Sequence, residues 1–138
     1  MYLAKLNTKP LGLKKPITVP ATVKNTRLAS QIMIKALEFE DQTPDSDNMV
    51  ATLKLEQELL DEQVKFLRTV LKLSEEQMDG VLDHIDFKDL ANYTSYVCQR
   101  IKGMSEGSYR KLVEELKKTP DEETEDPSSA KSTNSNKK

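Results

Sequence analysis

Apolar residues recur at three- and four-residue steps through most of residues 25–118, the spacing that places side chains on one side of an α-helix. Proline, glycine and short polar stretches divide this pattern into five segments. The first predicted helix begins at Asn25 or Thr26 and ends near Glu40. The other four cover residues 48–73, 74–85, 87–102 and 108–118. Residues 41–47 form a polar loop between the first two, where Asp45, Ser46 or Asp47 can cap the second helix.

The second predicted helix is the longest, and its apolar positions follow a heptad spacing interrupted by Gln57. These positions are Val50, Leu53, Leu60, Val64, Leu67 and Leu71. A heptad stripe fits either a seam within a helical bundle or a seam between two copies of a chain. Because other apolar helices are available in the same chain, we expect a seam within the molecule.

The shorter helices have narrower apolar faces, which we expect to point into the core. In the third helix the inward residues are Met78, Val81, Leu82 and Ile85. In the fourth they are Leu90, Ala91, Tyr93, Val97, Cys98 and Ile101, and in the fifth they are Leu112, Val113 and Leu116.

Two helix-start signals lie within residues 73–90. Ser74 can cap a helix, and Gln77 stands at the position of a capping box. Asp86 repeats the signal with Asp89, although Asp is not the preferred residue at that place. The two signals predict a short helix between two caps, and they indicate architecture without indicating chemistry.

Residues 1–24 lack helical periodicity, and Pro10, Pro16 and Pro20 exclude a long helix there. Two extended pieces, residues 1–6 and 17–19, predict a hairpin that a helix or a partner chain must cover, with edges that could serve for assembly. The expected fold is mainly α, a small bundle of about five helices with an N-terminal β-hairpin or extended segment. We expect the extended segment at residues 1–24, the helical domain at 25–118 and a disordered polar tail at 119–138.

Charge is segregated along the chain although the net charge is only -2. Residues 1–37 carry seven Lys or Arg and no acid, whereas residues 38–90 carry fifteen Asp or Glu against five Lys or Arg. This alternation lets the basic segment lie against the acidic one, within a molecule or between neighbours. A DNA-binding regulator that uses the basic N-terminal arm is an alternative, but such domains usually carry a net positive charge.

Residues that could support catalysis or bind a metal are scarce. Cys98 and His84 are the single cysteine and histidine, so an intrachain disulfide is impossible and a zinc site is effectively excluded. The four glycines are scattered and form no phosphate-binding loop. We therefore expect no catalytic residue, cofactor or metal, and we read Cys98 as a small buried residue. A small enzyme that depends on His84 remains an alternative.

The order of elements resembles that of the tail assembly chaperones of long-tailed bacteriophages that infect Gram-positive bacteria. The resemblance covers roughly residues 5–102. It lies in the strand Lys15-Pro16-Ile17-Thr18-Val19 leading directly into a helix, a polar loop, a long helix ending in Val-Leu-Lys-Leu, and the segment from Ser74-Glu75-Glu76-Gln77 to Phe87-Lys88-Asp89-Leu90.

The resemblance implies a small helical protein that is not an enzyme. It implies binding to the tape measure protein and the tail tube protein in the host cytoplasm, and release before the tail is finished. The N-terminus lacks the apolar stretch of a signal peptide, and no apolar run is long enough to span a membrane, so we expect no membrane partner. Self-association is possible.

A chaperone needs exposed apolar residues to hold its client. Five apolar residues lie off the main stripes and are candidates for partner binding: Leu11, Leu13, Phe39, Leu55 and Leu59. Each of them could equally complete the core.

Overall fold

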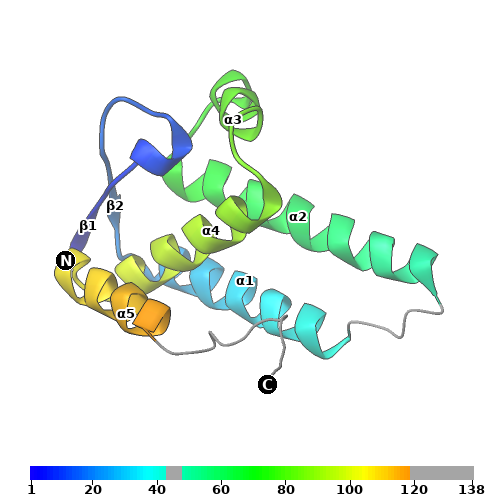
Figure 1. Cartoon of the computed structure of the whole chain (residues 1–138). Helices are drawn as coiled ribbons and strands as arrows, with labels where there is room; N and C mark the ends of the chain where they lie inside the picture. The colour runs from blue at the N-terminus through cyan, green and yellow to red at the C-terminus, as the bar shows by residue number, and fades with distance from the viewer. Residues whose placement is uncertain (43–47, 119–138) are drawn as a thin grey trace. The chain divides into compact units, whose positions relative to one another are not determined.

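The computed structural model describes residues 1–42 and 48–118, which divide into a unit of residues Met1–Met104 and a second unit that begins at Ser105. Figure 1 shows the elements in chain order. The predicted caps at Asp45, Ser46 and Asp47 and the predicted disordered tail lie outside the described residues. Within the described part, the predicted fold class is confirmed: an N-terminal hairpin is followed by five α-helices.

The N-terminal hairpin pairs β1 (Leu3–Leu6) with β2 (Ile17–Pro20) in antiparallel register, and a 3-10 turn (Lys9–Leu11) follows β1. Alternate residues of the two strands point in opposite directions. The inward ones, Ala4, Leu6 and Val19, are completely buried. The hairpin therefore contributes one face to the core, as a two-stranded sheet must in order to be stable.

Helix α4 (Phe87–Ile101) lies against the outer edge of β1 and contacts it with polar side chains. The backbone N–H of Asn7 donates to the Tyr96 hydroxyl at 2.8 Å, and the Tyr93 hydroxyl donates to the Asn7 carbonyl at 2.8 Å. Arg100 Nη1 donates to the Lys5 carbonyl at 2.8 Å. These bonds satisfy backbone groups of Lys5 and Asn7 that would otherwise be open to another strand.

Helix α1 (Val23–Asp41) begins slightly earlier than predicted because Thr22 caps it, its hydroxyl accepting from the Asn25 N–H at 3.0 Å. Helix α2 (Met49–Leu71) is capped by Asn48 and stops at Lys72, which adopts the left-handed conformation with φ of 56°. Both ends of α2 lie within two residues of their predicted positions.

Helices α3 (Glu75–Leu82) and α4 (Phe87–Ile101) each begin with a complete capping box. The box at Asp86 forms despite the aspartate at its third position, because the Asp89 carboxylate accepts from the Asp86 N–H at 3.3 Å. At the other end of α4, Gly103 has φ of 110° and terminates the helix as predicted.

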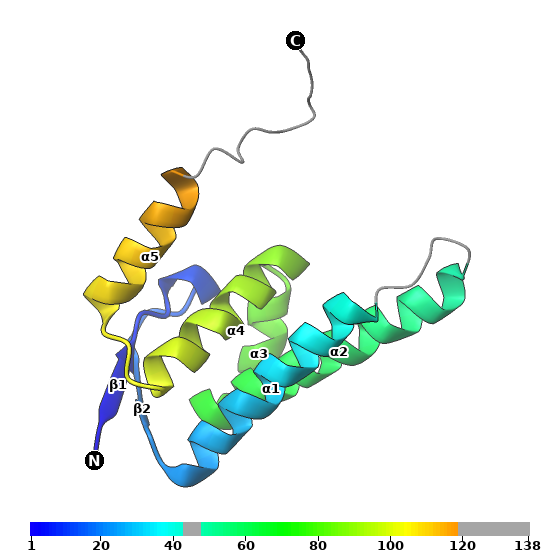
Figure 2. The same cartoon turned by 90° about the horizontal axis from the view of Figure 1, so that it is seen from below.

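Helices α1, α2 and α4 pack against one another and form the core of the first unit, with β1 against α4 and β2 against α2. Figure 2 shows α1 and α2 side by side and antiparallel. Contacts distant in sequence connect the layers: the Cys98 thiol donates to the Ala29 carbonyl at 3.6 Å, and Lys102 Nζ donates to Ser30 Oγ at 2.8 Å.

The predicted heptad seam of α2 is only partly correct. Leu67 and Leu71 are buried, whereas Val50 and Leu53 are 63% and 54% exposed. The buried face of α2 also contains residues outside the predicted seam, namely Leu59, Gln63, Phe66 and Val70. The prediction fails at the N-terminal end of the helix, where α1 still lies beside α2 but α4 does not reach.

Some inward residues predicted for the short helices are also wrong. In α3, Met78 and Val81 are buried but Leu82 is exposed. The second unit contains helix α5 (Glu106–Lys118), which starts two residues before its predicted position. Its residues Leu112 and Leu116 are 38% and 64% exposed, and among the described residues of this unit no second helix or strand covers them.

Candidate partner-binding surface

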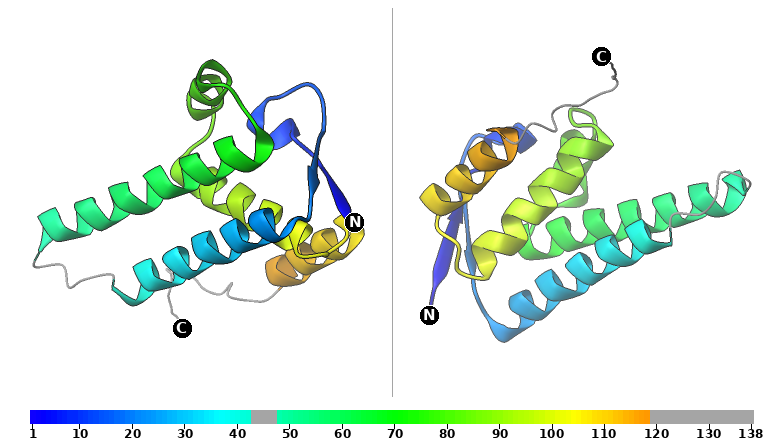
Figure 3. Two further views of the ribbon diagram at one scale, coloured as in Figure 1. Left: turned by 180° about the vertical axis from the view of Figure 1, so that it is seen from behind. Right: turned by 60° about the horizontal axis from the view of Figure 1, so that its bottom comes forward.

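Exposed apolar residues of the first unit gather on α1 and α2. Ile34 and Leu37 on α1 are more than half exposed, and so are Met49, Val50 and Leu53 on α2. Figures 1 and 3 show why: α4 crosses one end of the α1–α2 pair, and the other end continues past it. Single exposed apolar residues need no explanation, but a group on two neighbouring helices indicates a surface for binding another protein.

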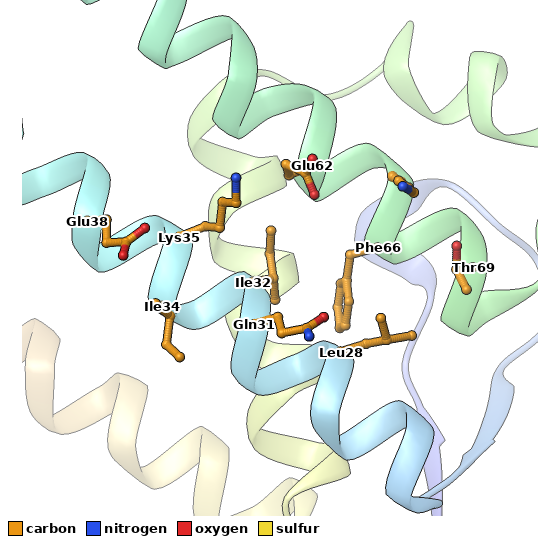
Figure 4. A pocket seen from close by; sticks show the side chains of 10 residues that line it. Leu28, Gln31, Ile32, Ile34, Lys35, Glu38, Glu62, Phe66 and Thr69 are labelled. Atoms are coloured by element: carbon orange, nitrogen blue, oxygen red, sulfur yellow. The ribbon is translucent and has the colours of Figure 1, made fainter.

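A groove of about 420 Å³ runs between α1 and α2. Its apolar lining comes from Leu28, Ile32 and Ile34 on α1 and from Phe66 on α2. Lys35 and Glu62 lie at its rim and come from opposite helices, as Figure 4 shows. An apolar floor between charged walls is suited to an amphipathic segment of another protein.

Three of the five predicted partner-binding residues meet at a second, smaller cavity of about 50 Å³ between the same helices. Phe39 lies on α1, and Leu55 and Leu59 lie one turn apart on α2. Lys35 and Glu38 line both this cavity and the larger groove, so the two hollows are continuous along the helix pair.

The five predicted residues fall into two groups, buried and partly exposed. Leu59 is 7% exposed and Leu11 is 2% exposed, so both contribute to the core in the way the alternative reading proposed. Phe39, Leu55 and Leu13 are partly exposed. Leu11 and Leu13 lie at the 3-10 turn of the hairpin and do not line the cavity that holds the other three.

The histidine and the cysteine lie in different surroundings, His84 on the surface and Cys98 in the core. Within residues 1–42 and 48–118, no group of three or more His, Cys, Asp or Glu could hold a metal ion. His84 is exposed, and its Nδ1 lies 2.8 Å from the Gly80 carbonyl at the end of α3. Cys98 is fully buried, and desolvation by burial raises the pKa of its thiol to about 12 despite the opposing charge of Lys102. A protonated, inaccessible thiol is a poor nucleophile.

Charged residues of the basic N-terminal segment are available to solvent. Lys5, Lys9, Lys14, Lys15 and Lys24 are all exposed. Among the described helices, none is both long enough and apolar enough to cross a membrane.

Two important features of this unit were missed from the sequence. Gln63 is 3% exposed in the middle of the buried face of α2, although Gln57 on the same helix is exposed. The exposed stripe at Val50 and Leu53 was assigned to the core. The heptad count places Leu53 on the same side of the helix as Leu67. It gives no information on where the helix packed against that side, α4, ends.

Residues 4–119, most of the chain, match the model of a family described as phage tail assembly chaperone proteins, TAC. No curated protein and no solved structure matches the chain.

Proposed function

Because the chain belongs to the family of phage tail assembly chaperones, we propose that it binds the tape measure protein and the tail tube protein while the tail is built, without catalysing a reaction. The match over residues 4–119 is the observation that carries this proposal. The host cytoplasm is the proposed place of action, since the tail proteins are made there.

The shape of the α1–α2 pair supports a binding role. A chaperone must cover apolar surface of an unassembled client and must itself present apolar surface to do so. The groove lined by Ile32 and Phe66 provides such a surface, and the partly exposed Phe39 and Leu55 extend it. We assign these residues to the client-binding side of the molecule.

Co-expression tests the proposal directly. The tagged full chain is produced together with the tape measure protein, and separately with the tail tube protein, of the same phage genome. We expect each protein to co-purify with the chain and to remain in solution longer than when it is produced alone. Lack of co-purification with both proteins would contradict the proposal.

Deletion of the gene from the phage provides the functional readout. We expect lysates that contain heads but no complete tails in electron micrographs, and rescue by the wild-type gene supplied in trans. A His84→Ala gene should rescue as well as the wild type, because a non-catalytic chaperone does not need the imidazole. Loss of rescue by this variant would support the enzyme alternative.

A further inference from the structure

The apolar stripe of α2 continues past the part of the helix that is buried. Leu53, Leu60 and Leu67 are separated by seven residues each and so lie along one side of the helix. Leu67 is buried, Leu60 is partly exposed and Leu53 is 54% exposed. Exposure therefore rises steadily along one stripe, from the core toward the N-terminal end of α2.

Helix α1 has a corresponding stripe on its α4 side. The Ala29 carbonyl accepts from the Cys98 thiol of α4, which identifies this side of α1. Met33, one turn further along, is partly exposed, and Leu37, after a second turn, is 61% exposed. We call Met33, Leu37, Val50, Leu53 and Leu60 together the distal face.

The distal face continues an interface that already accepts a helix. Helix α4 packs against both α1 and α2 in the buried part of the unit. Figure 3 shows both helices continuing beyond the end of α4 in two further views. A surface that continues the seat of an amphipathic helix, with the same type of apolar side chain, is suited to a second amphipathic helix.

The charged residues around the distal face indicate which charge a partner helix should carry. Residues 38–42 and 48–62, which include the distal ends of both helices, contain seven acidic residues and one basic residue, Lys54, and five of the seven acids lie outside the groove lining. Glu38, Glu40 and Asp41 stand in the last turns of α1, where the helix dipole disfavours acids, so these carboxylates do not stabilise α1. The excess of negative charge favours a partner helix with Lys or Arg beside its apolar stripe.

We propose that the distal face binds a basic amphipathic helix of a tail protein, with Leu37 and Leu53 as its main apolar contacts. The identity of the partner rests on the proposed function, and the position and chemistry of the binding surface rest on the fold. The bound helix takes, on the distal halves of α1 and α2, the place that α4 takes on their proximal halves.

A Leu53→Asp variant of the full chain tests the apolar part of the proposal. The probe is the full-length tape measure protein of the same phage, with the tail tube protein as second probe, and binding is measured by titration calorimetry. We expect at least a tenfold loss of affinity with the probe that uses this face, because a carboxylate replaces a central apolar contact. Val23→Asp is the control, since Val23 is 77% exposed at the first residue of α1, outside both the groove and the distal face, and we expect less than a threefold change.

A pair of charge reversals tests the electrostatic part. Glu56→Lys combined with Asp61→Lys should weaken binding several-fold and reduce its dependence on salt. Asp79→Lys combined with Glu114→Lys changes the net charge equally at exposed sites on α3 and α5, and should leave binding unchanged. Overlapping synthetic peptides of the bound probe should then identify a basic amphipathic segment.

The possible results separate the two proposals. If the wild-type chain binds neither probe, the proposed function fails and this inference fails with it. If the wild type binds but Leu53→Asp binds equally well, only the inference is overturned. If light scattering shows that Leu53→Asp converts a dimer into a monomer, the distal face holds a second copy and the inference is likewise overturned. Circular dichroism establishes that each variant is folded.

Discussion

Arg100 of α4 donates a hydrogen bond from Nη1 to the carbonyl of Lys5 in β1, joining residues 95 positions apart at 2.8 Å. The same guanidinium donates to the Met104 carbonyl at 2.9 Å and to the Tyr96 hydroxyl at 3.2 Å. Arg100 is 6% exposed. Burial by itself would lower its pKa, but hydrogen bonds with Tyr2 and Tyr96 outweigh that effect and raise the pKa, so the charge is retained.

Replacing Arg100 should therefore open the joint between the hairpin and α4. We expect Arg100→Met to lower the free energy of unfolding by about 2 to 4 kcal/mol, because the bonds to a charged donor are lost and buried acceptors remain unpaired. Urea unfolding followed by circular dichroism measures the change. Arg110→Met, at a side chain that is 72% exposed, is the control and should change stability by less than about 0.5 kcal/mol. Equal effects of the two variants would contradict the proposed role of Arg100.

Cys98 should make stability depend on alkaline pH. The folded chain holds the thiol pKa at about 12, above its value in the unfolded chain, so the unfolded state loses the proton first as pH rises. The stabilising contribution is complete below about pH 8.5, the ordinary thiol pKa, and is lost between there and pH 12. In that interval we expect the free energy of unfolding of the wild type to fall by about 1.4 kcal/mol per pH unit more than that of Cys98→Ala. Parallel pH profiles for the two proteins would refute the expectation.

The same burial protects Cys98 from reagents. At pH 8 we expect a thiol-specific disulfide reagent to label the native chain only at the rate of unfolding, and to label it at once in 6 M guanidinium. Rapid labelling of the native chain would show that the cysteine is accessible.

Gln63 offers a site where the chain can be stabilised. Its Oε1 atom is buried and has no hydrogen-bond partner among the described residues, which costs free energy in the folded state. Gln63→Met keeps the length of the side chain and removes the polar group, so we expect the free energy of unfolding to rise by about 1 kcal/mol. Gln57→Met, at an exposed position of the same helix, should have little effect. A loss of stability in Gln63→Met would mean that the amide makes a bond that outweighs its burial.

The two capping boxes predict similar losses on truncation. Ser74 Oγ accepts from the Gln77 N–H at 3.0 Å, and the Asp86 carboxylate accepts from the Asp89 N–H at 2.7 Å. Ser74→Ala and Asp86→Ala should each lower the free energy of unfolding by about 1 kcal/mol. Ser95→Ala, at an exposed site inside α4, should be neutral or slightly stabilising, since Ala is the better helix former.

These caps were predictable because a capping box is formed by residues three positions apart. Ser74 and Asp86 need only their own short segment, and the structure places α3 and α4 directly after them. The start of α1 was predicted at Asn25 or Thr26, at least two residues late, although Thr22 is as acceptable a cap as Asn25. The structure selects Thr22 and leaves Asn25 to donate from Nδ2 to the Pro20 carbonyl at 2.9 Å.

Burial was harder to predict because it depends on where other elements end. Leu53 and Leu67 occupy equivalent heptad positions, yet one is exposed and the other buried. The contacts of Arg100 were not predictable either, since the Lys5 and Met104 carbonyls that it binds belong to the backbone and have no signature in the sequence. The sequence therefore predicts that exposed apolar residues form the candidate surface, but it identifies only some of their positions.

The covering of β1 by α4 has a consequence for synthesis of the chain. Residues 1–20 leave the ribosome well before residues 93–100, which carry the groups that satisfy Lys5 and Asn7. Helices α1 and α2 can pair as soon as both have emerged, whereas the hairpin must wait for almost the entire first unit. Translation thus orders the assembly of the unit, and its first strand is among the last elements to reach its final place.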